Sequence, residues 1–257
     1  MRQARYSGQF YPEEKKELLL MLNNFLEKNN KARAKGIIVP HAGYTFSGKT
    51  AGKAYSLLKD SEIAVIIGTN HSSSDSCISL EDFQTPLGVV KNAEESDKIA
   101  DKIKIDEQVH RNEHSIEVQI PFLQKINPDI KIIPLLAGHT FEDSKKLAET
   151  IYNSVRKDFV FIISSDFTHA GQSYGFSVDY QQAREMDMQA IKKILDLDSE
   201  GFDNVARKTT ICGKNAILAG IELAKYLRLK PRLVDFSSSA ELTGKTNFVN
   251  YASIVFE

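Results

Sequence analysis

Cysteine is scarce in this 257-residue chain, and tryptophan is absent. The two cysteines, Cys77 and Cys212, are too few for a disulfide framework. The N-terminal stretch MRQARYSGQF lacks the apolar core of a signal peptide. The longest apolar runs, LLLML and IIPLLAG, are far too short to span a bilayer. We therefore expect a cytoplasmic protein that folds under reducing conditions and is not inserted in a membrane.

An excess of charge of either sign is also missing. The chain has 33 basic and 34 acidic residues, which gives a net charge of -1 with neutral histidines. No overall field then attracts nucleic acid, anionic membrane surfaces or acidic substrates. We expect neither nucleic acid nor a membrane among the partners of this protein.

What the chain does contain is an alternation of short apolar, β-branched runs with longer helix-periodic segments. Strands are predicted at 36–40, 62–68, 77–80, 130–138, 159–165, 232–237 and 251–256. Helices are predicted within 12–30, 47–60, 147–155, 180–197 and 214–229. This order predicts an α/β fold, a three-layer αβα sandwich with a mostly parallel or mixed central sheet. Because no linker-like segment divides residues 1–257, we expect a single domain.

Histidines follow three of the predicted strands. His41 follows the first strand, His71 lies shortly after the second, and His169 follows the strand at 159–165, three residues after Asp166. Open α/β sheets bind ligands outside the carboxyl ends of their strands. Any one of these histidines could be a loop residue bonded to backbone, but three at equivalent positions indicate a site.

Cys212 adds a thiol to this set. It lies at a predicted turn-to-helix boundary, where free backbone N–H groups and the helix dipole favour a thiolate. Thiolate and imidazole together suit zinc, copper or iron rather than magnesium or calcium. Cys77 lies in a strand pattern, and we expect it to be a small buried apolar residue.

The segment RNEHSIEVQIPFLQ is a second dense polar stretch. Glu113, His114 and Glu117 precede a predicted helix. In one interpretation, Ser115 caps the helix and the charges are solvated. In the other, the carboxylate–histidine pair is an acid/base group or supports a metal ligand. His110 and His139 have no such setting, so we interpret both as surface or structural residues.

Residues 43–50, GYTFSGKT, match the phosphate-binding pattern GxxxxGK[ST] of nucleotide hydrolases. Such a loop turns successive backbone N–H groups inward, and Tyr44, Thr45 and Phe46 are ill suited to the positive φ angles this requires. We therefore interpret the match as a coincidence. Gly43 and Gly48 are expected to let the chain turn from the strand into the next helix.

An ordered series of motifs resembles the Memo family. It comprises FYP (10–12), PHAGYTFSG (40–48), GTNH (68–71), TPLG (85–88), EHSIEVQIPFLQ (113–124), PLLAG (134–138), SSDFTHAG (164–171) and CGKNA (212–216). The series runs from residue 10 to the C-terminal strand. The resemblance implies one Memo-like domain over 1–257, with an αβα fold similar to class III extradiol dioxygenases. It also implies a pathway shared with a radical-SAM enzyme and a third small protein.

The resemblance also carries over site residues. It matches His41, His71 and Cys212 to the family's metal-binding positions, with non-haem iron or copper expected and zinc as an alternative. It places Asp166 and His169 beside the metal, and it matches His114 to the histidine of the EHS motif. The cysteine stands where the dioxygenases use a carboxylate, so their activity should not be transferred.

The sequence departs from the family pattern at two positions. Thr69 stands where proline is commoner in the family, and the chemistry is expected to be unaffected. Ala170 stands where a bulky aromatic is frequent, and we expect it to alter the shape of the pocket.

Three functions remain compatible with these residues. The first is a metal-dependent redox enzyme in which His169 is the general acid/base, Asp166 orients it and His114 assists. The second is a metal-free enzyme in which Cys212 attacks a carbonyl group, with His41 or His169 as its base and Asp166 as the residue that orients the base. The third is a non-enzymatic adaptor that binds a peptide or phosphopeptide in the same cleft. Small-molecule and peptide ligands are therefore both expected.

Overall fold

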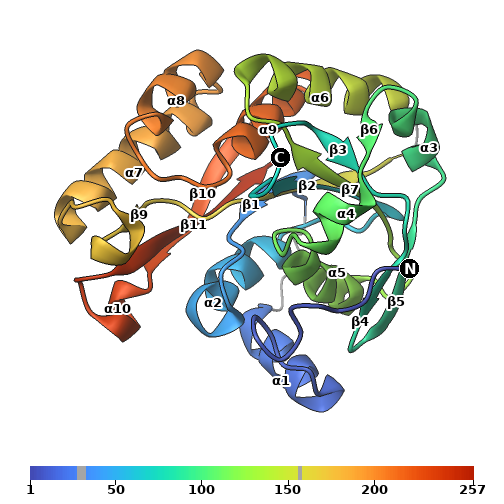
Figure 1. The fold of residues 1–257 in the computed structure, drawn as a ribbon, viewed down its shortest axis with the longest axis horizontal. Helices are drawn as coiled ribbons and strands as arrows, with labels where there is room; N and C mark the ends of the chain where they lie inside the picture. The colour runs from blue at the N-terminus through green and yellow to red at the C-terminus, as the bar shows by residue number, and fades with distance from the viewer. Residues whose placement is uncertain (28–32, 156–157) are drawn as a thin grey trace.

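The computed structural model describes residues 1–27, 33–155 and 158–257 of the chain. They form a mixed sheet of eleven strands covered by helices on both faces (Figure 1). This confirms the predicted three-layer αβα sandwich. No helix in these ranges is both long and apolar enough to cross a membrane.

Four parallel strands form the centre of the sheet. In spatial order they are β1 (Gly36–Val39), β8 (Val160–Ser164), β2 (Ile63–Thr69) and β7 (Lys131–Ala137). All of their residues except Lys131 are buried, as expected for strands covered on both faces. Because the strands are parallel, the loops after β1, β2 and β8 leave the sheet at the same edge.

The antiparallel strand pairs lie on the two sides of these four central strands. On one side β1 pairs with β11 (Phe248–Phe256), which pairs in turn with β10 (Pro231–Ser238) and β9 (His169–Ala170). On the other side, β7 contacts β3 (Cys77–Ile78) and β5 (Gly88–Asn92), which extend to β6 (Lys104–Ile105) and β4 (Phe83–Thr85). The sequence predicted β3, β10 and β11 and missed β4, β5, β6 and β9, whose two to five residues are too few to show a period.

The helices divide between the two faces. One face carries α1 (Lys15–Phe25), α2 (Tyr44–Tyr55), η1 (Glu117–Gln119) and α5 (Ile120–Ile126). The other carries α6 (Phe141–Ser154), α7 (Tyr180–Leu195), α8 (Ser199–Ala206) and α9 (Lys214–Tyr226). Four shorter helices lie in the connections: α3 (Glu95–Ala100), α4 (Glu107–Arg111), η2 (Gln172–Tyr174) and α10 (Ala240–Thr243). The sequence predicted the long helices, while residues 28–30 of the first predicted helix lie outside the described residues.

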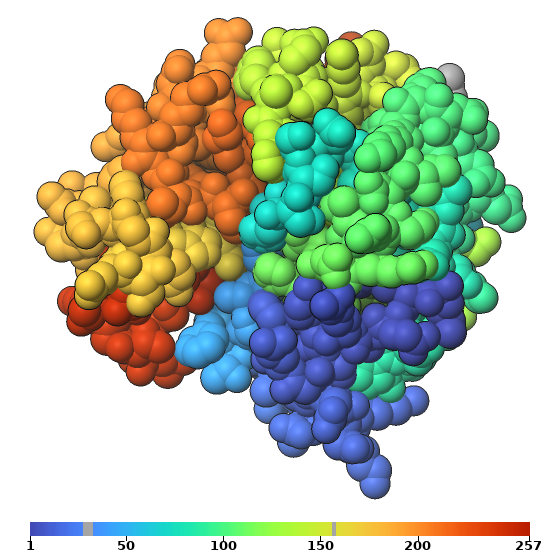
Figure 2. Space-filling model, viewed as in Figure 1, coloured from blue at the N-terminus to red at the C-terminus, as the bar shows by residue number. Residues whose placement is uncertain are grey.

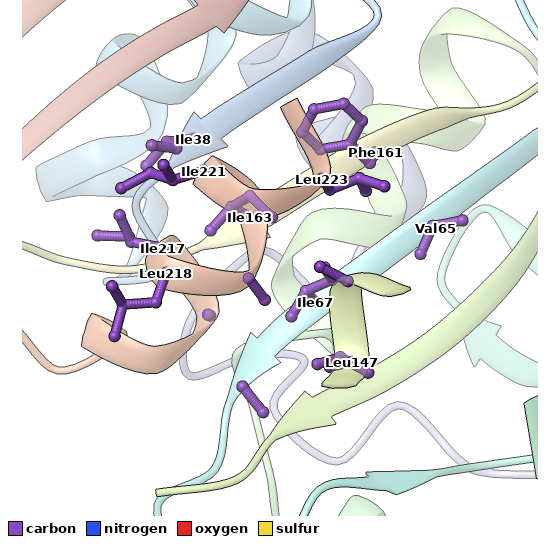
Figure 3. Close-up of a cluster of buried hydrophobic side chains, with 14 of the residues drawn as sticks. Ile38, Val65, Ile67, Leu147, Phe161, Ile163, Ile217, Leu218, Ile221 and Leu223 are labelled. Carbon is purple, nitrogen blue, oxygen red and sulfur yellow. The ribbon is translucent and has the colours of Figure 1, made fainter. Parts of the chain in front are cut away.

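Helix α9 packs closely on the centre of the sheet. Figure 3 shows its Ile217 and Ile221 beside Ile38 of β1 and Ile163 of β8. A Cβ atom on Gly220 would lie 2.7 Å from the Ile163 side chain, so glycine permits this close approach. The packing fixes the N-terminal end of α9 near the strand ends.

The nucleotide-loop pattern forms the start of a helix. Helix α2 begins at Tyr44, so residues 44–50 are helical rather than a cradle of N–H groups. Gly48 was expected to turn the chain, and this prediction is wrong. It lies inside α2, where a Cβ atom would lie 2.3 Å from the ring of Phe25. The glycine is needed for the packing of α1 on α2.

Candidate metal centre

The loops after β1, β2 and β8 bring the predicted ligands together at one edge of the sheet. His41 follows β1, His71 follows β2, and Cys212 lies just before α9. One ligand atom from each of the three lies within 4.8 Å of the others. The sequence separation of these residues is large, so the parallel sheet and the packing of α9 create the cluster.

Hydrogen bonds determine which nitrogen of His41 carries the proton. Its Nδ1 lies 3.0 Å from Ser164 Oγ, and that hydroxyl donates its single proton to the carbonyl of Ser115 at 2.6 Å. Ser164 must therefore accept from His41 Nδ1–H. Burial and the neighbouring His71 lower the pKa of His41 to about 3, so its ring is neutral. The lone pair on Nε2 then faces Cys212 Sγ, 3.2 Å away.

Glu113 orients His71. Its carboxylate oxygens lie 3.0 Å from His71 Nδ1, and one of them accepts the backbone N–H of His71 at 3.0 Å. Burial opposes ionisation of Glu113, but its contacts with His71 outweigh burial and lower the pKa of Glu113 to about 2. The same contacts outweigh desolvation at His71 and raise the pKa of its imidazole. With Nδ1 directed at the carboxylate, His71 has Nε2 available for a ligand.

The environment of Cys212 does not favour the free thiolate. The backbone N–H of Asp166 donates to Sγ at 3.3 Å. Burial, followed by the charge of Asp166, nevertheless raises the pKa of Cys212 to about 12. The helix boundary predicted a thiolate at Cys212, and this prediction is wrong: the surrounding protein groups favour the protonated thiol. Cys77 is buried in β3, as predicted.

Asp166 and His169 lie beside this cluster. Asp166 Oδ1 accepts the backbone N–H groups of His41 at 2.8 Å and Ala42 at 3.3 Å, while burial raises the pKa of the carboxyl. Its Oδ2 lies 4.0 Å from His169 Nε2, which is too long for a hydrogen bond. The carbonyl of Thr210 accepts His169 Nδ1–H at 3.1 Å instead. The carbonyl of Thr210, and not the carboxylate of Asp166, therefore orients the ring of His169.

His114 forms part of an aromatic wall next to the cluster. Its ring stacks on His71 with centroids 5.0 Å apart and contacts Phe10 at 4.6 Å. Burial, followed by the nearby His41, lowers the pKa of His114 to about 4. The neighbouring Ser115 does not cap a helix: Ile116 is the N-cap of η1, which has no side-chain capping bond, and the Ser115 hydroxyl donates to the carbonyl of Thr69 at 2.9 Å. The capping interpretation is therefore wrong for Ser115.

A cavity of about 340 Å³ opens over these residues. The segments around it are the N-terminal segment, the start of α2, the segment near η2, and the α10–β11 region. They are coloured dark blue, light blue, gold and red where they adjoin in Figure 2. His41, His71, His114, Asp166 and His169 all line it. Ala170 does not: it is fully buried against Phe248, so the expectation that it shapes the pocket is wrong.

Three supporting residues were not identified from the sequence. Ser164 and Gln119 hold His41, since Gln119 Nε2 donates to Ser164 Oγ at 2.9 Å, and Thr210 holds His169. Ser164 lies in the SSDFTHAG motif and Gln119 in EHSIEVQ, which is the only signal available. Nothing in the sequence shows that one serine connects two of these segments.

The two remaining histidines lie outside the cluster. His139 Nε2 contacts the carbonyl of Asn70 at 2.9 Å, and His110 is buried with Nε2 3.4 Å from the carbonyl of Cys77. The structural interpretation of both is consistent with these contacts.

Acid is expected to destabilise the fold through His110. Burial lowers its pKa from 6.5 to about 4, so the unfolded chain binds the proton first as the pH falls. The contribution of neutral His110 to the free energy of unfolding is fully present above pH ~6.5. It is lost as the pH falls from ~6.5 to ~4, and the total loss is about 3 kcal/mol. Urea unfolding across this range should show a smaller loss in His110→Gln than in the wild type. Parallel pH profiles for the two proteins would contradict this prediction.

Comparison with known proteins agrees with the motif series. The family model described as Memo-like protein matches residues 2–255. A MEMO1 family protein of Archaeoglobus fulgidus is 35% identical over 266 residues, covering 100% of this chain and 99% of the relative. One from Pyrococcus furiosus is 36% identical over 291 residues, covering 99% and 98%. One from Methanosarcina barkeri is 35% identical over 275 residues, covering 100% of both. The chain therefore belongs to the Memo family.

Proposed function

We propose that this protein binds one transition-metal ion through His41, His71 and Cys212. Iron or copper is the proposed metal, with zinc as the alternative. The observation that carries the proposal is the convergence of one ligand atom from each residue within 4.8 Å. Imidazole and thiolate ligands suit these metals and not magnesium or calcium.

The hydrogen bonds around the histidines support this assignment. Both Nδ1 atoms are directed at oxygen partners, Ser164 for His41 and Glu113 for His71. A metal-binding histidine usually donates its other N–H to a carboxylate, carbonyl or similar group, which fixes the ring and its tautomer. The low pKa of His41 also suits a ligand, because a metal binds the neutral imidazole.

The same pKa values weigh against a metal-free thiol enzyme. A nucleophilic cysteine needs a nearby base or cation that makes it a thiolate. His41 lies against Cys212, but its pKa of about 3 makes it a poor base, and the pKa of the thiol is about 12. A bound cation would supply the positive charge that is needed beside Cys212 Sγ to stabilise a thiolate.

We further propose a redox role acting on a ligand in the adjoining cavity. Two histidines and one anion leave coordination positions open, and bound iron or copper supplies electron-transfer or Lewis-acid chemistry there. His169 lines the cavity and donates Nδ1–H to Thr210, which leaves Nε2 to accept or return a proton. Asp166 is buried between His41 and His169, and its carboxylate accepts the backbone N–H of His41.

Metal analysis of protein purified anaerobically without chelator tests this function. We expect close to one equivalent of iron, copper or zinc per chain, removed by a chelator and restored by adding back the metal. Repeating the analysis with each metal offered alone and in competition identifies the preferred one. Protein that holds none of the three, before or after reloading, would overturn the proposal.

A further inference from the structure

The lining of the cavity beside the proposed metal has few permanently charged side chains with which to bind an ionic ligand. Among the described residues, no lysine or arginine lines it, and Asp166 is the one carboxylate that does. Asp166 is itself buried, with Oδ1 occupied by two backbone N–H groups. Phosphate and carboxylate groups are normally held by arginine, lysine or clustered N–H groups. The described residues that line this cavity therefore provide no lysine or arginine to bind a phosphate or carboxylate group.

Aromatic rings form much of the wall in their place. Phe10, Phe46, Tyr174 and Tyr251 line the cavity together with the ring of His114. Phe46 and Tyr174 are 43% and 45% exposed, although large apolar side chains are usually buried. They come from α2 and η2, elements that are far apart in the sequence, and they flank the same opening. Exposed rings gathered at a cavity mouth indicate a ligand that covers them.

The hydroxyl groups on the α10 side are largely engaged within the protein. Ser239 Oγ accepts the N–H of Val249 at 2.9 Å, and Thr243 Oγ1 donates to the carbonyl of Ser239 at 3.0 Å. The amide of Asn247 is engaged on one side only: its Oδ1 accepts the N–H of Ser173 at 2.9 Å, and its Nδ2 can still donate to a ligand. The histidines and Asp166 gather at the other end of the cavity, beside the proposed metal, and we expect the polar end of a ligand there. A ligand that fits has one polar end and an apolar, planar body.

We propose that the cavity binds an uncharged aromatic small molecule of one or two rings. Its hydroxyl or carbonyl group would point toward His169 and the metal cluster, and its ring would lie between Phe46 and Tyr174. The volume of about 340 Å³ is at the lower end for small-molecule pockets, which agrees with this size. The orientation of the polar end rests on the proposed metal site, whereas recognition of the ring does not. A phosphorylated peptide is disfavoured, because no arginine or lysine lines the described part of the cavity to hold its phosphate.

Three probes with one carbon skeleton test this inference: 2-naphthol, 2-naphthyl phosphate and the saturated 2-decalol. Calorimetry on metal-stripped protein should show 2-naphthol binding at least about tenfold more tightly than the other two. Phe46→Ala and Tyr174→Ala should each weaken 2-naphthol binding by about tenfold. Tyr152→Ala is the matched control, since Tyr152 is also 43% exposed but lies on α6, away from the cavity. It should bind 2-naphthol as the wild type does.

Equal or tighter binding of the phosphate would overturn the inference, since it would reveal an anion site. Equal binding of 2-decalol would overturn the aromatic preference, and so would equal losses in Phe46→Ala and Tyr152→Ala. Stripped protein separates this result from the metal proposal. If 2-naphthol binds but no metal is found in purified protein, the proposed function fails and the aromatic site stands. If metal is found and 2-naphthol does not bind, only the inference fails.

Discussion

The Cys212→Ala variant is expected to purify as a folded protein with at least about tenfold weaker metal affinity than the wild type. Cys212 supplies the one anionic atom of the proposed ligand set, and His41 with His71 would keep only two neutral nitrogens. The loss should be larger for copper than for zinc, because soft thiolates contribute most to copper binding. Metal content after anaerobic purification, and competition with a chromophoric chelator, measure both effects.

Cys77→Ala is the matched control for this variant. It also removes a thiol, but Cys77 lies in β3 and lines neither the cluster nor the cavity. It should keep the wild-type metal content. Cys212→Ser retains a group that can accept the Asp166 N–H, so it separates loss of the soft ligand from loss of the local fold. Full metal content in both alanine variants would exclude Cys212 as a ligand.

The strand-end histidines could be found from the sequence because parallel strands impose a simple rule. Continuous apolar runs identified β1, β2 and β8, and the residue after each such run must lie at the same edge of the sheet. His41, His71 and Asp166 follow directly from this rule. It gives the neighbourhood of each side chain but not its rotamer or its hydrogen bonds.

The position of Cys212 beside His41 and His71 depends on the packing of α9 against the sheet, which no periodic pattern in the sequence reveals. A Cβ atom on Gly213 would lie 2.4 Å from Ser165 Cβ, so the start of α9 reaches the end of β8 only with glycine there. The high pKa of the thiol was missed for a related reason. Helix-boundary arguments count nearby N–H groups, whereas burial and Asp166 dominate in the folded protein.

The role of the N-terminal segment could not be predicted at all. Arg2 is one of two arginines in a stretch without periodicity, yet its side chain is 2% exposed. Its Nη2 lies 2.9 Å from Glu117 Oε2 and donates to the carbonyl of Glu113 at 2.6 Å. Glu113 in turn holds His71, so the second residue of the chain is connected to the candidate metal centre. Such long-range pairing has no local signal.

Arg2→Met is expected to lower the free energy of unfolding by about 3 kcal/mol, because it leaves the carboxylate of Glu117 buried without its cation. The side chain of Glu117 is 1% exposed, and the remaining donors to it, which include Tyr11 and the N–H of Tyr6, are neutral. Urea unfolding measures the loss. The double variant Arg2→Met/Glu117→Gln should recover at least about half of it, because no unpaired charge then remains buried.

Arg5→Met separates this ion pair from a general effect of removing positive charge. Arg5 lies three residues away and is exposed, so its replacement should change stability by no more than about 0.5 kcal/mol. Equal effects of Arg2→Met and Arg5→Met would show that the buried pair contributes nothing special. A double variant no more stable than Arg2→Met would assign the loss to the Arg2 contacts with Phe83 and the Glu113 carbonyl instead. Either result would show that an unpaired charge on Glu117 is not the cause of the lost stability.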